Sequence, residues 1–318
     1  MESSLLVIKN LNVNFRTRAG LVRAANGVSL EIRKGETLAL VGESGCGKTI
    51  IALAIMRLLV ENALITGEIL FRGQNLLGLN EEEMRNIRGR EIAAIFEQPA
   101  SCLNPVMQIG EQIAEAVMAH EKCPKREAKM RAKEIMEMVG IPAVRYRNYP
   151  HEFSGGMQQR AMIAMALACR PSLLIADEPT TALDVTVQAQ ILELLKELTL
   201  KNNTAMLLIT HDLGIIAEMA DTVAVMYAGT ILERGSIKSI LKNPQHPYTM
   251  ALLGAIGEEE LNPLPGSVAS LCALPPGCPF HPRCVLAGEI CFRKMPELIS
   301  YNGSKVRCHY AGRSKAVV

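Results

Sequence analysis

Short runs of apolar residues, many of them β-branched or leucine, alternate along this chain with longer segments in which apolar residues recur at helical spacing. The continuous runs predict strands at residues 5–14, 37–41, 69–72, 92–96, 173–176, 205–210 and 222–227. The helically spaced segments predict helices at residues 48–60, 109–120, 125–139, 156–168 and 187–201. Strands that are apolar throughout, with helices between them, are typical of a parallel or mixed sheet covered on both faces. The pattern therefore predicts an α/β fold.

Two parts of the chain depart from this alternation. Residues from about 99 to 155 contain no convincing strand, which predicts a helical insertion subdomain. After about residue 257, seven prolines fall among five cysteines, which is typical of a loop-rich segment without a large core of its own. We therefore expect a core domain over residues 1–257 and a Cys- and Pro-rich C-terminal extension over residues 258–318.

Composition narrows the class of protein. Of the 318 residues, 49% are hydrophobic and 21% are charged, which suits a folded core, and the net charge is only +2. Aromatic residues make up 4% and there is no tryptophan, so neither a basic coat nor a base-stacking surface for nucleic acid is indicated. No apolar run approaches 18 residues, and the first residues lack the pattern of a secretory signal. We expect a soluble cytoplasmic protein that does not bind nucleic acid.

A glycine-rich loop joins the predicted strand 37–41 to the helix that follows it. The loop fits the pattern G-x-x-x-x-G-K-[ST] and reads Gly42-Glu43-Ser44-Gly45-Cys46-Gly47-Lys48-Thr49. Its backbone N–H groups and the helix N-terminus are suited to binding phosphate oxygens. Lys48 can reach the β- and γ-phosphates, and the Thr49 hydroxyl can join the Mg²⁺ shell. The loop predicts a site for ATP and Mg²⁺.

A second acidic motif follows the predicted strand 173–176. The strand ends in Asp177-Glu178, and a carboxylate at that end of a buried strand is the usual means of holding Mg²⁺ beside a phosphate loop. Asp177 is therefore the expected magnesium-side carboxylate. Glu178, one residue further on, is the expected general base that polarises the attacking water.

Three further segments resemble the ATP-binding-cassette (ABC) ATPases. Phe153-Ser154-Gly155-Gly156-Met157-Gln158-Gln159-Arg160 resembles the signature of that family, Thr180–Asp184 resembles its D-loop, and His211 matches its switch histidine. The resemblance implies a P-loop NTPase core that hydrolyses ATP. It also implies that Ser154, Gly155 and Gly156 face the γ-phosphate held by a second, related or identical ATPase subunit, and that His211 contacts the γ-phosphate.

Two positions leave alternatives open. Phe15 is a candidate to stack on adenine, or it is an ordinary strand aromatic. The family usually reads Phe-Gln-Glu/Asp-Pro after its corresponding strand, whereas this chain reads Phe96-Glu97-Gln98-Pro99. Either Gln98 takes the family's role beside Mg²⁺ and the membrane partner, or Glu97 occupies that position.

Further segments resemble one group within the family and extend the resemblance to nearly the whole chain. Asn243–Thr249, the segment Gly277–Cys284 and Ser101–Pro105 are similar to motifs of the oligopeptide, dipeptide and nickel importer ATPases. This resemblance implies a peripheral subunit on the cytoplasmic face of the cell membrane, bound to two membrane permease subunits and served indirectly by an extracytoplasmic solute-binding protein.

The resemblance leaves the cargo and two other functions open. Di- or oligopeptides are the expected cargo, with nickel or another small solute as the alternative. A soluble ABC ATPase without a transport role fits less well, because the chain has one phosphate loop and no heptad repeat. A regulatory module in which ATP only switches a cysteine site fits less well too, because Glu178 favours hydrolysis.

Four of the nine cysteines form a candidate metal site in the extension. Cys278, Cys284, Cys291 and Cys308 can surround one centre, and their spacing lacks the C-x₂-C pairs of most structural zinc sites. Four thiolates match a [4Fe–4S] cluster, and related peptide-importer ATPases carry an iron–sulfur centre at a matching pattern. Zinc or free thiols are the alternatives, and Cys272 is left over. We expect this site to lie far from the phosphate loop, so that its loss disturbs the extension more than ATP hydrolysis.

Overall fold

The computed structural model describes residues 4–18, 20–181, 183–254 and 266–311, and the chain divides into two compact units. One, the helical unit, comprises residues 33–36 and 78–208. The other, the sheet unit, comprises residues 4–32, 37–77 and the described residues from 209 onward. The phosphate loop and the cysteine-rich extension therefore fall in the same unit.

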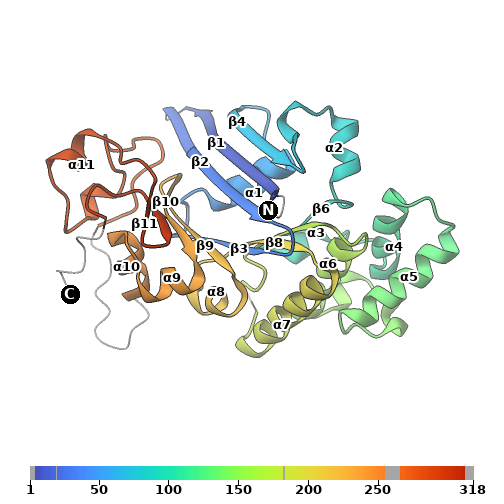
Figure 1. Ribbon diagram of the computed structural model, residues 1–318. Coiled ribbons are helices and arrows are strands. Elements are labelled where there is room, and N and C mark those ends of the chain that lie inside the picture. The colour runs from blue at the N-terminus through green and yellow to red at the C-terminus, as the bar shows by residue number, and fades with distance from the viewer. Residues whose placement is uncertain (1–3, 19, 182, 255–265, 312–318) are drawn as a thin grey trace. The chain divides into compact units, whose positions relative to one another are not determined.

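The helical unit contains three strands and most of the helices (Figure 1). Its strands lie in the order β8-β7-β6, and β6 and β7 are parallel, with Ile92 opposite Leu173. These strands span Ile92–Ile95 (β6), Leu173–Asp177 (β7) and Ala205–Ile209 (β8). Its α-helices are Glu81–Ile87 (α2), Pro99–Cys102 (α3), Ile109–His120 (α4), Lys125–Met138 (α5), Gly155–Leu167 (α6) and Val185–Asn202 (α7). Strands β6 and β7 have almost entirely buried residues, as the continuous apolar runs predicted.

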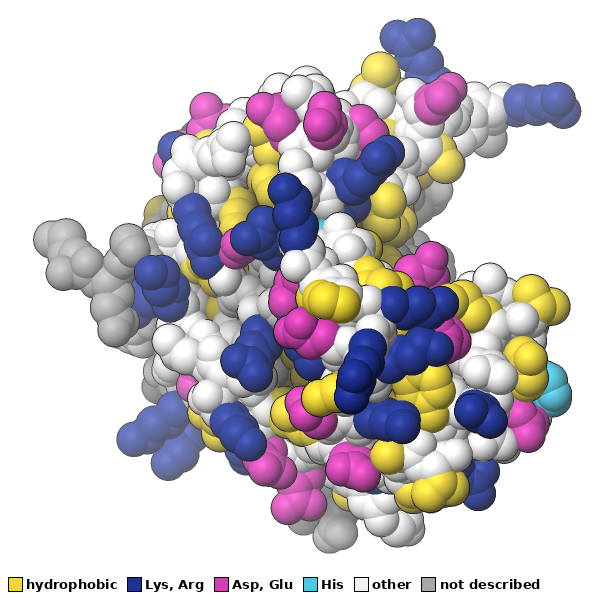
Figure 2. Space-filling model, turned by 90° about the vertical axis from the view of Figure 1, so that its right-hand side faces the viewer, with side chains coloured by type: hydrophobic (Ala, Val, Ile, Leu, Met, Phe, Trp, Pro, Cys, Tyr) yellow, Lys and Arg dark blue, Asp and Glu magenta, His cyan; other side chains and the backbone are white. Residues whose placement is uncertain are grey.

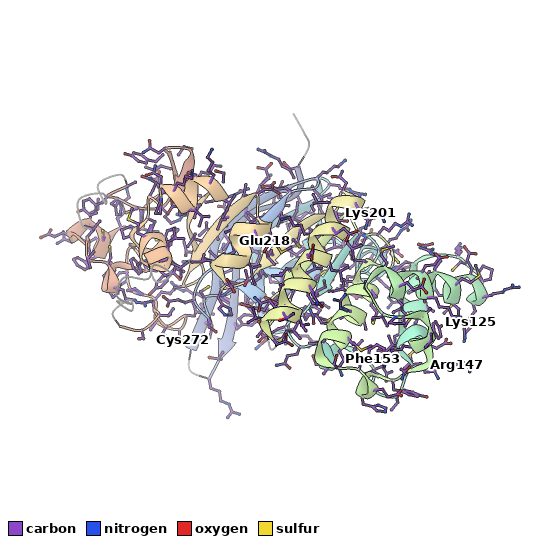
Figure 3. The ribbon with its side chains drawn as sticks, turned by 90° about the horizontal axis from the view of Figure 1, so that it is seen from below. Lys125, Arg147, Phe153, Lys201, Glu218 and Cys272 are labelled. Atoms are coloured by element: carbon purple, nitrogen blue, oxygen red, sulfur yellow. The ribbon has the colours of Figure 1, made fainter. Side chains whose placement is uncertain are left out.

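The segment between β6 and β7 is helical. Residues 99–155 form α3, α4, α5 and two 3₁₀ turns, Ala143–Arg147 (η2) and Pro150–Glu152 (η3), with no strand in that stretch. Figure 3 labels Lys125, Arg147 and Phe153 in this region. Helices α4 and α5 pack on each other because each has an apolar face, which includes Ile113 and Ala128.

The sheet unit contains two sheets (Figure 1). One has the order β2-β1-β4-β5, with β4 antiparallel to both β1 and β5. Its strands are Ser4–Thr17 (β1), Gly20–Arg33 (β2), Ala63–Phe71 (β4) and Gln74–Asn75 (β5). The other has the order β11-β12-β10-β9-β3 within this unit and is mixed, because β3 and β9 are parallel while β9 and β10 are antiparallel. Its strands are Thr37–Val41 (β3), Thr222–Tyr227 (β9), Thr230–Ser236 (β10), Ile299–Tyr301 (β11) and Ser304–Val306 (β12).

Short helices connect the strands of the sheet unit. They are Lys48–Met56 (α1), Leu76–Gly78 (η1), Leu213–Met219 (α8), Ile237–Lys242 (α9), Pro247–Gly254 (α10), His281–Arg283 (η4) and Glu289–Arg293 (α11). Helix α1 ends four residues earlier than predicted. Arg57 adopts a left-handed conformation with φ of 50°, and its N–H donates to the carbonyls of Ala54 and Leu53, which closes the helix.

The cysteine-rich extension shares a core with the rest of the sheet unit. Strand β12 pairs with β10, and the buried residues Cys278, Phe280 and Cys291 belong to the same apolar cluster as Val41 and Tyr227. The expected boundary at residues 257 and 258 lies outside the described residues. From residue 266 onward the extension packs onto β9, β10 and α10 through this cluster instead of forming a core of its own.

Two surface properties bear on function. Within the described ranges, none of the helices is both long and apolar enough to cross a bilayer. Figure 2 shows Lys and Arg side chains interspersed with Asp and Glu over one face of the molecule, in keeping with the small net charge of +2.

Candidate functional site

The phosphate loop has the strand–loop–helix structure that the motif predicted. Strand β3 ends at Val41, and α1 begins at Lys48 with Gly47 as its left-handed N-cap. Gly47 has φ of 102°, and a Cβ there would lie 2.1 Å from the Ala24 carbonyl oxygen. A Cβ on Gly42 would lie 2.1 Å from the Met226 carbonyl oxygen. Both positions require glycine because the backbone of β2 or β9 passes directly beside the loop.

The side chains of the loop divide by exposure. Lys48 is only 8% exposed, and its Nζ donates to the carbonyl oxygens of Gly42 (2.8 Å) and Glu43 (3.2 Å). Cys46 is buried, and burial raises the pKa of its thiol, which makes it a core residue and not a nucleophile. The exposed positions of the loop and of the first helical turn, which are available to a ligand, are Ser44, Gly45 and Thr49.

The acidic pair lies at the end of β7 in the helical unit. Asp177 is the last residue of the strand and is 3% exposed. Glu178 has φ of 49°, a conformation that few residues with a Cβ adopt, and Thr181 Oγ1 donates to its Oε2 at 3.1 Å. A strained backbone and a hydrogen-bonded carboxylate fix the direction of a side chain, as a general base requires.

The signature segment forms the start of α6. Ser154 is the N-cap and accepts a hydrogen bond from the Met157 N–H at 3.4 Å. Ser154 and Gly155 are exposed, so the first N–H groups of this helix face outward and can bind an anion from another molecule. Gly156 lies against α7, where a Cβ would be 2.6 Å from Val187 Cγ1.

Sequence reasoning did not identify the role of Gln159. This side chain is 2% exposed, and its Nε2 donates to the Pro179 carbonyl oxygen at 2.5 Å. The bond ties the signature helix to the turn that carries Glu178. The signal was available in the sequence, because a polar residue on the buried face of a helix requires a partner.

Gln98 and Glu97 are both exposed, and Gln98 is the N-cap of α3. Either side chain can therefore take the predicted role beside Mg²⁺. Phe15 is half-buried in β1 opposite Ala63. His211 is exposed and follows Thr210, whose N–H donates to the Leu40 carbonyl of β3 at 3.4 Å.

The predicted site residues fall in both units. Phe15, the phosphate loop and His211 belong to the sheet unit, whereas Gln98, the signature and the acidic pair belong to the helical unit. Each set is locally organised as described above. Their meeting around one nucleotide stays a prediction, and Ala182 of the D-loop lies outside the described residues.

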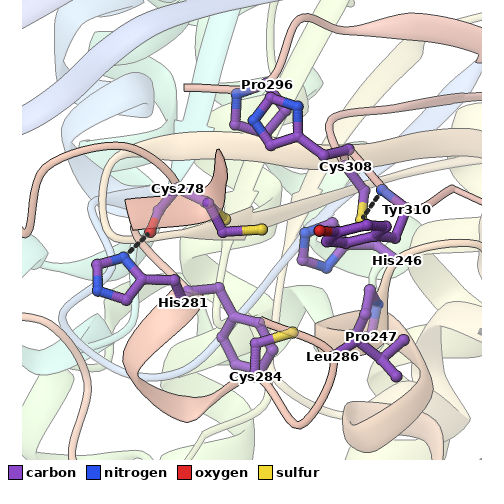
Figure 4. A pocket seen from close by; sticks show the side chains of 12 residues that line it. His246, Pro247, Cys278, His281, Cys284, Leu286, Pro296, Cys308 and Tyr310 are labelled. Carbon is purple, nitrogen blue, oxygen red and sulfur yellow. Dashed lines mark hydrogen bonds between the residues drawn. The ribbon is translucent and has the colours of Figure 1, made fainter. Parts of the chain in front are cut away.

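The four predicted cysteines surround one small cavity (Figure 4). Cys278, Cys284, Cys291 and Cys308 line it together with His246, whereas Cys272 is exposed and does not. Burial raises the pKa of Cys278 to about 12 and that of Cys308 to about 11, so both are neutral thiols. The cavity has a volume of about 10 Å³, and no three His, Cys, Asp or Glu side chains of the described chain are positioned to hold a metal ion.

The expectation that the cysteine site lies far from the phosphate loop is wrong. Arg283 directly precedes Cys284, and its Nη1 donates to Glu43 Oε2 (2.8 Å) and Oε1 (3.1 Å) in the phosphate loop. The Glu43 backbone N–H donates to Tyr248 Oη at 3.0 Å. Glu43 and Arg283 are 240 residues apart, so no local pattern could have revealed the pair.

Comparison with known protein families and relatives agrees with the local geometry. Residues 25–181 match the family model "ABC transporter", and residues 232–291 match "Oligopeptide/dipeptide transporter, C-terminal region". The dipeptide transport ATP-binding protein of Bacillus subtilis (strain 168) is 48% identical over 96% of this chain and 94% of its own length. The oligopeptide transport ATP-binding protein of the same organism is 51% identical over 92% of this chain and 85% of its own length.

Two solved structures share the fold. A dimeric ATP-binding cassette in a post-hydrolysis state, bound to ADP and Pi, has a TM-score of 0.67 and 26% identity, and the match covers 73% of this chain and 98% of that one. A cassette from Clostridium perfringens that is part of an ABC transporter complex has a TM-score of 0.65 and 25% identity, over 76% of this chain and 92% of that one.

Proposed function

The chain belongs to the ABC transporter family and is an ATPase, and from this premise we propose that it powers the import of di- or oligopeptides. The proposal rests on matches that cover 92–96% of the chain. Relatives named for dipeptide and oligopeptide transport are 48% and 51% identical, and the match includes the C-terminal region as well as the cassette. The family model that names oligopeptide and dipeptide transport matches residues 232–291, outside the cassette match at residues 25–181.

The C-terminal motif has a defined structural basis in this chain. Glu233 is fully buried in β10 and accepts the N–H groups of Gln245 (2.8 Å) and His246 (2.9 Å). The His246 ring in turn accepts the Tyr248 N–H through Nδ1 at 3.0 Å. The Glu233 carboxylate and the His246 ring therefore hold the backbone of this segment in one conformation against β10.

The proposed chemistry assigns one task to each site residue. Lys48 and the loop N–H groups bind the β- and γ-phosphates of ATP. The donors available for Mg²⁺ are hard oxygens, which that ion prefers, from Thr49, Asp177 and Gln98. Glu178 accepts a proton from the attacking water, and His211 contacts the γ-phosphate. Bound Mg²⁺ would neutralise charge on the phosphates.

The proposed assembly follows from the outward-facing signature. Exposed Ser154 and Gly155 support a dimer in which the signature of one ATPase meets the γ-phosphate bound by a second, identical or related one. We propose that this dimer binds two membrane permease subunits at the cytoplasmic face of the membrane. A solute-binding protein on the other side would deliver the peptide.

Reconstitution tests this function. The chain is purified with its permeases and partner ATPase, placed in proteoliposomes, and supplied with binding protein and a labelled dipeptide. ATP-dependent peptide uptake is expected, and Glu178→Gln in the same complex should eliminate it. Uptake of a nickel chelate without uptake of any peptide would replace the proposed cargo, and ATP hydrolysis with no uptake of either would contradict a transport role.

We further propose that the four cysteines hold an iron–sulfur cluster, with zinc as the competing occupant. Four thiols around one cavity match the ligand number of a [4Fe–4S] cluster. Four thiolates bound to zinc would lie about 3.8 Å apart, given Zn–S bonds of about 2.3 Å. The four thiols line one cavity, and no three of the described His, Cys, Asp or Glu side chains form such a set.

Colour tests the cluster directly. Protein purified without oxygen should be brown and contain iron and acid-labile sulfide, and Cys284→Ser should bleach it. Cys272→Ser is the matched control and should stay brown. Colourless protein with one zinc would exclude the cluster and keep the four-cysteine site, whereas metal-free protein would exclude both.

A further inference from the structure

Glu43 places an acidic side chain within the phosphate loop. It is the second residue of the loop, between Gly42 and Ser44, and we have proposed that this loop binds the phosphates of ATP. At the separations within one loop, two negative charges repel each other appreciably even at the protein surface. A glutamate here therefore requires a compensating charge for the loop to bind ATP well.

Arg283 supplies that charge from the C-terminal extension. Its Nη1 donates to both carboxylate oxygens of Glu43, at 2.8 and 3.1 Å, and the two side chains are 6% and 23% exposed. Burial acts to lower the pKa of the guanidinium, but hydrogen bonds to Glu43 and Tyr227 outweigh it, so the pKa of Arg283 is raised. The pair is largely shielded from solvent, unlike an exposed ion pair.

Arg283 is itself held firmly in place. Its guanidinium lies over the Tyr227 ring, 5.8 Å from the ring centre. Phe280, three residues earlier, is 2% exposed and packs edge-on to Tyr227 at 5.3 Å and against Tyr248 at 5.3 Å. Tyr248 is the residue that accepts the Glu43 N–H. One aromatic cluster therefore positions both partners of Glu43.

We propose that Arg283 is a positioning residue for ATP: it neutralises Glu43 and, with Tyr248, sets the shape of the first half of the phosphate loop. The proposal rests on the ATPase activity and goes beyond it, because it makes the C-terminal extension part of the nucleotide site. It also links that site to the cysteines, since Cys284 is the next residue after Arg283.

The test is a charge-rescue experiment on the full-length chain. ATP, ADP and adenosine are titrated by calorimetry into wild type, Arg283→Met, Glu43→Gln and the double variant. Methionine keeps an unbranched apolar stem over Tyr227 and removes the charge. We expect Arg283→Met to weaken ATP binding about tenfold, or about 1.4 kcal/mol, to weaken ADP binding less, and to leave adenosine unchanged.

The rescue separates the charge effect from a structural one. Glu43→Gln alone leaves the Arg283 charge uncompensated beside the loop, so it should bind ATP more tightly than wild type, and the double variant should recover most of the affinity that Arg283→Met loses. The effect of Arg283→Met should also shrink at high salt. Arg293→Ala is the matched control, because it removes an exposed ion pair with Glu289 in the same extension and should change nothing.

Several results would overturn the proposal. Unchanged ATP affinity in Arg283→Met would show that Glu43 needs no compensation. Equal losses for ATP, ADP and adenosine, or no recovery in the double variant, would show that Arg283 only packs the extension. Glu43→Gln is informative even where Arg283→Met does not fold, since a large loss of ATP affinity in that variant would also contradict the proposal. Wild-type protein that binds no ATP would instead contradict the proposed function.

Discussion

Helices α6 and α7 approach each other closely at Gly156, so a larger residue at this position should destabilise the protein. A Cβ at Gly156 would lie 2.6 Å from Val187 Cγ1, well inside van der Waals contact. Gly155, the preceding residue, would place its Cβ 3.7 Å from Leu183 Cδ2, an ordinary contact. Neither glycine has a positive φ, so alanine suits the backbone at both positions. Gly156→Ala and Gly155→Ala therefore differ in packing alone.

The expected magnitudes follow from this difference. Overpacking a well-packed interface costs about 1–3 kcal/mol, and replacing glycine by alanine in a helix returns up to about 1 kcal/mol. Gly156→Ala should therefore lower the free energy of unfolding of the 318-residue chain by about 1–2 kcal/mol, or lower the melting temperature by about 1.5–3 °C. Gly155→Ala should be neutral or slightly stabilising.

A double-mutant cycle tests the cause. Val187→Ala removes the atom that the new Cβ meets, at its own cost of about 1 kcal/mol. In the double variant the clash is absent, so the loss should be smaller than the sum of the single losses by about 1–2 kcal/mol. Stability is measured by chemical denaturation and by thermal unfolding of the full chain. Additive losses, or equal effects at Gly155 and Gly156, would refute the packing argument.

Three further predictions follow from single side chains. Glu178→Gln should lower ATP turnover about 10²–10⁴-fold while ATP binding persists. Steady-state hydrolysis assays together with nucleotide-binding titrations check this. Unchanged turnover would show that Glu178 is not the general base. Lys48→Ala should weaken ATP binding itself, because it removes the positive ammonium charge that binds the phosphates. Equal ATP affinity of the variant and wild type by calorimetry would contradict that role. Burial lowers the pKa of His246 to about 3, so below pH 6.5 the unfolded chain takes up a proton that the folded chain does not. The free energy of unfolding should then fall by up to about 1.4 kcal/mol for each unit by which the pH is lowered from 6.5 to 3. His246→Asn should remove this contribution to the pH dependence. An identical pH dependence of stability in the variant and wild type would contradict the prediction.

The sequence predicted best where structure is decided locally. The bounds of β3 and the start of α1 agree with the pattern, because a glycine-rich loop between an apolar strand and a helix allows few conformations. The end of α1 was overestimated since Leu58 and Val60 continue the apolar pattern, yet they are 46% and 63% exposed. Hydrophobicity alone does not reveal a left-handed cap at Arg57.

Strand β10 shows why some elements were missed. It contains Glu233 and Arg234, which interrupt an apolar run and argue against a buried strand. Glu233 is nevertheless fully buried, because the N–H groups of Gln245 and His246 bind its carboxylate. The hydrogen-bond partners that stabilise this buried carboxylate lie outside the strand, so the strand's own sequence does not reveal them. The same holds for Glu43 and Arg283.

The pairing of β12 with β10 has a practical consequence for anyone who shortens this protein. Ser304–Val306 cover the Glu233–Gly235 side of β10, and β9 covers the other side. Truncating the chain near residue 257, where the sequence analysis places a domain boundary, would remove β12. Strand β10 would then have unpaired N–H and C=O groups at the edge of the sheet. Such edges recruit strands from other molecules. We therefore expect a cassette shortened in this way to aggregate on expression, because β10 would then be an open edge strand.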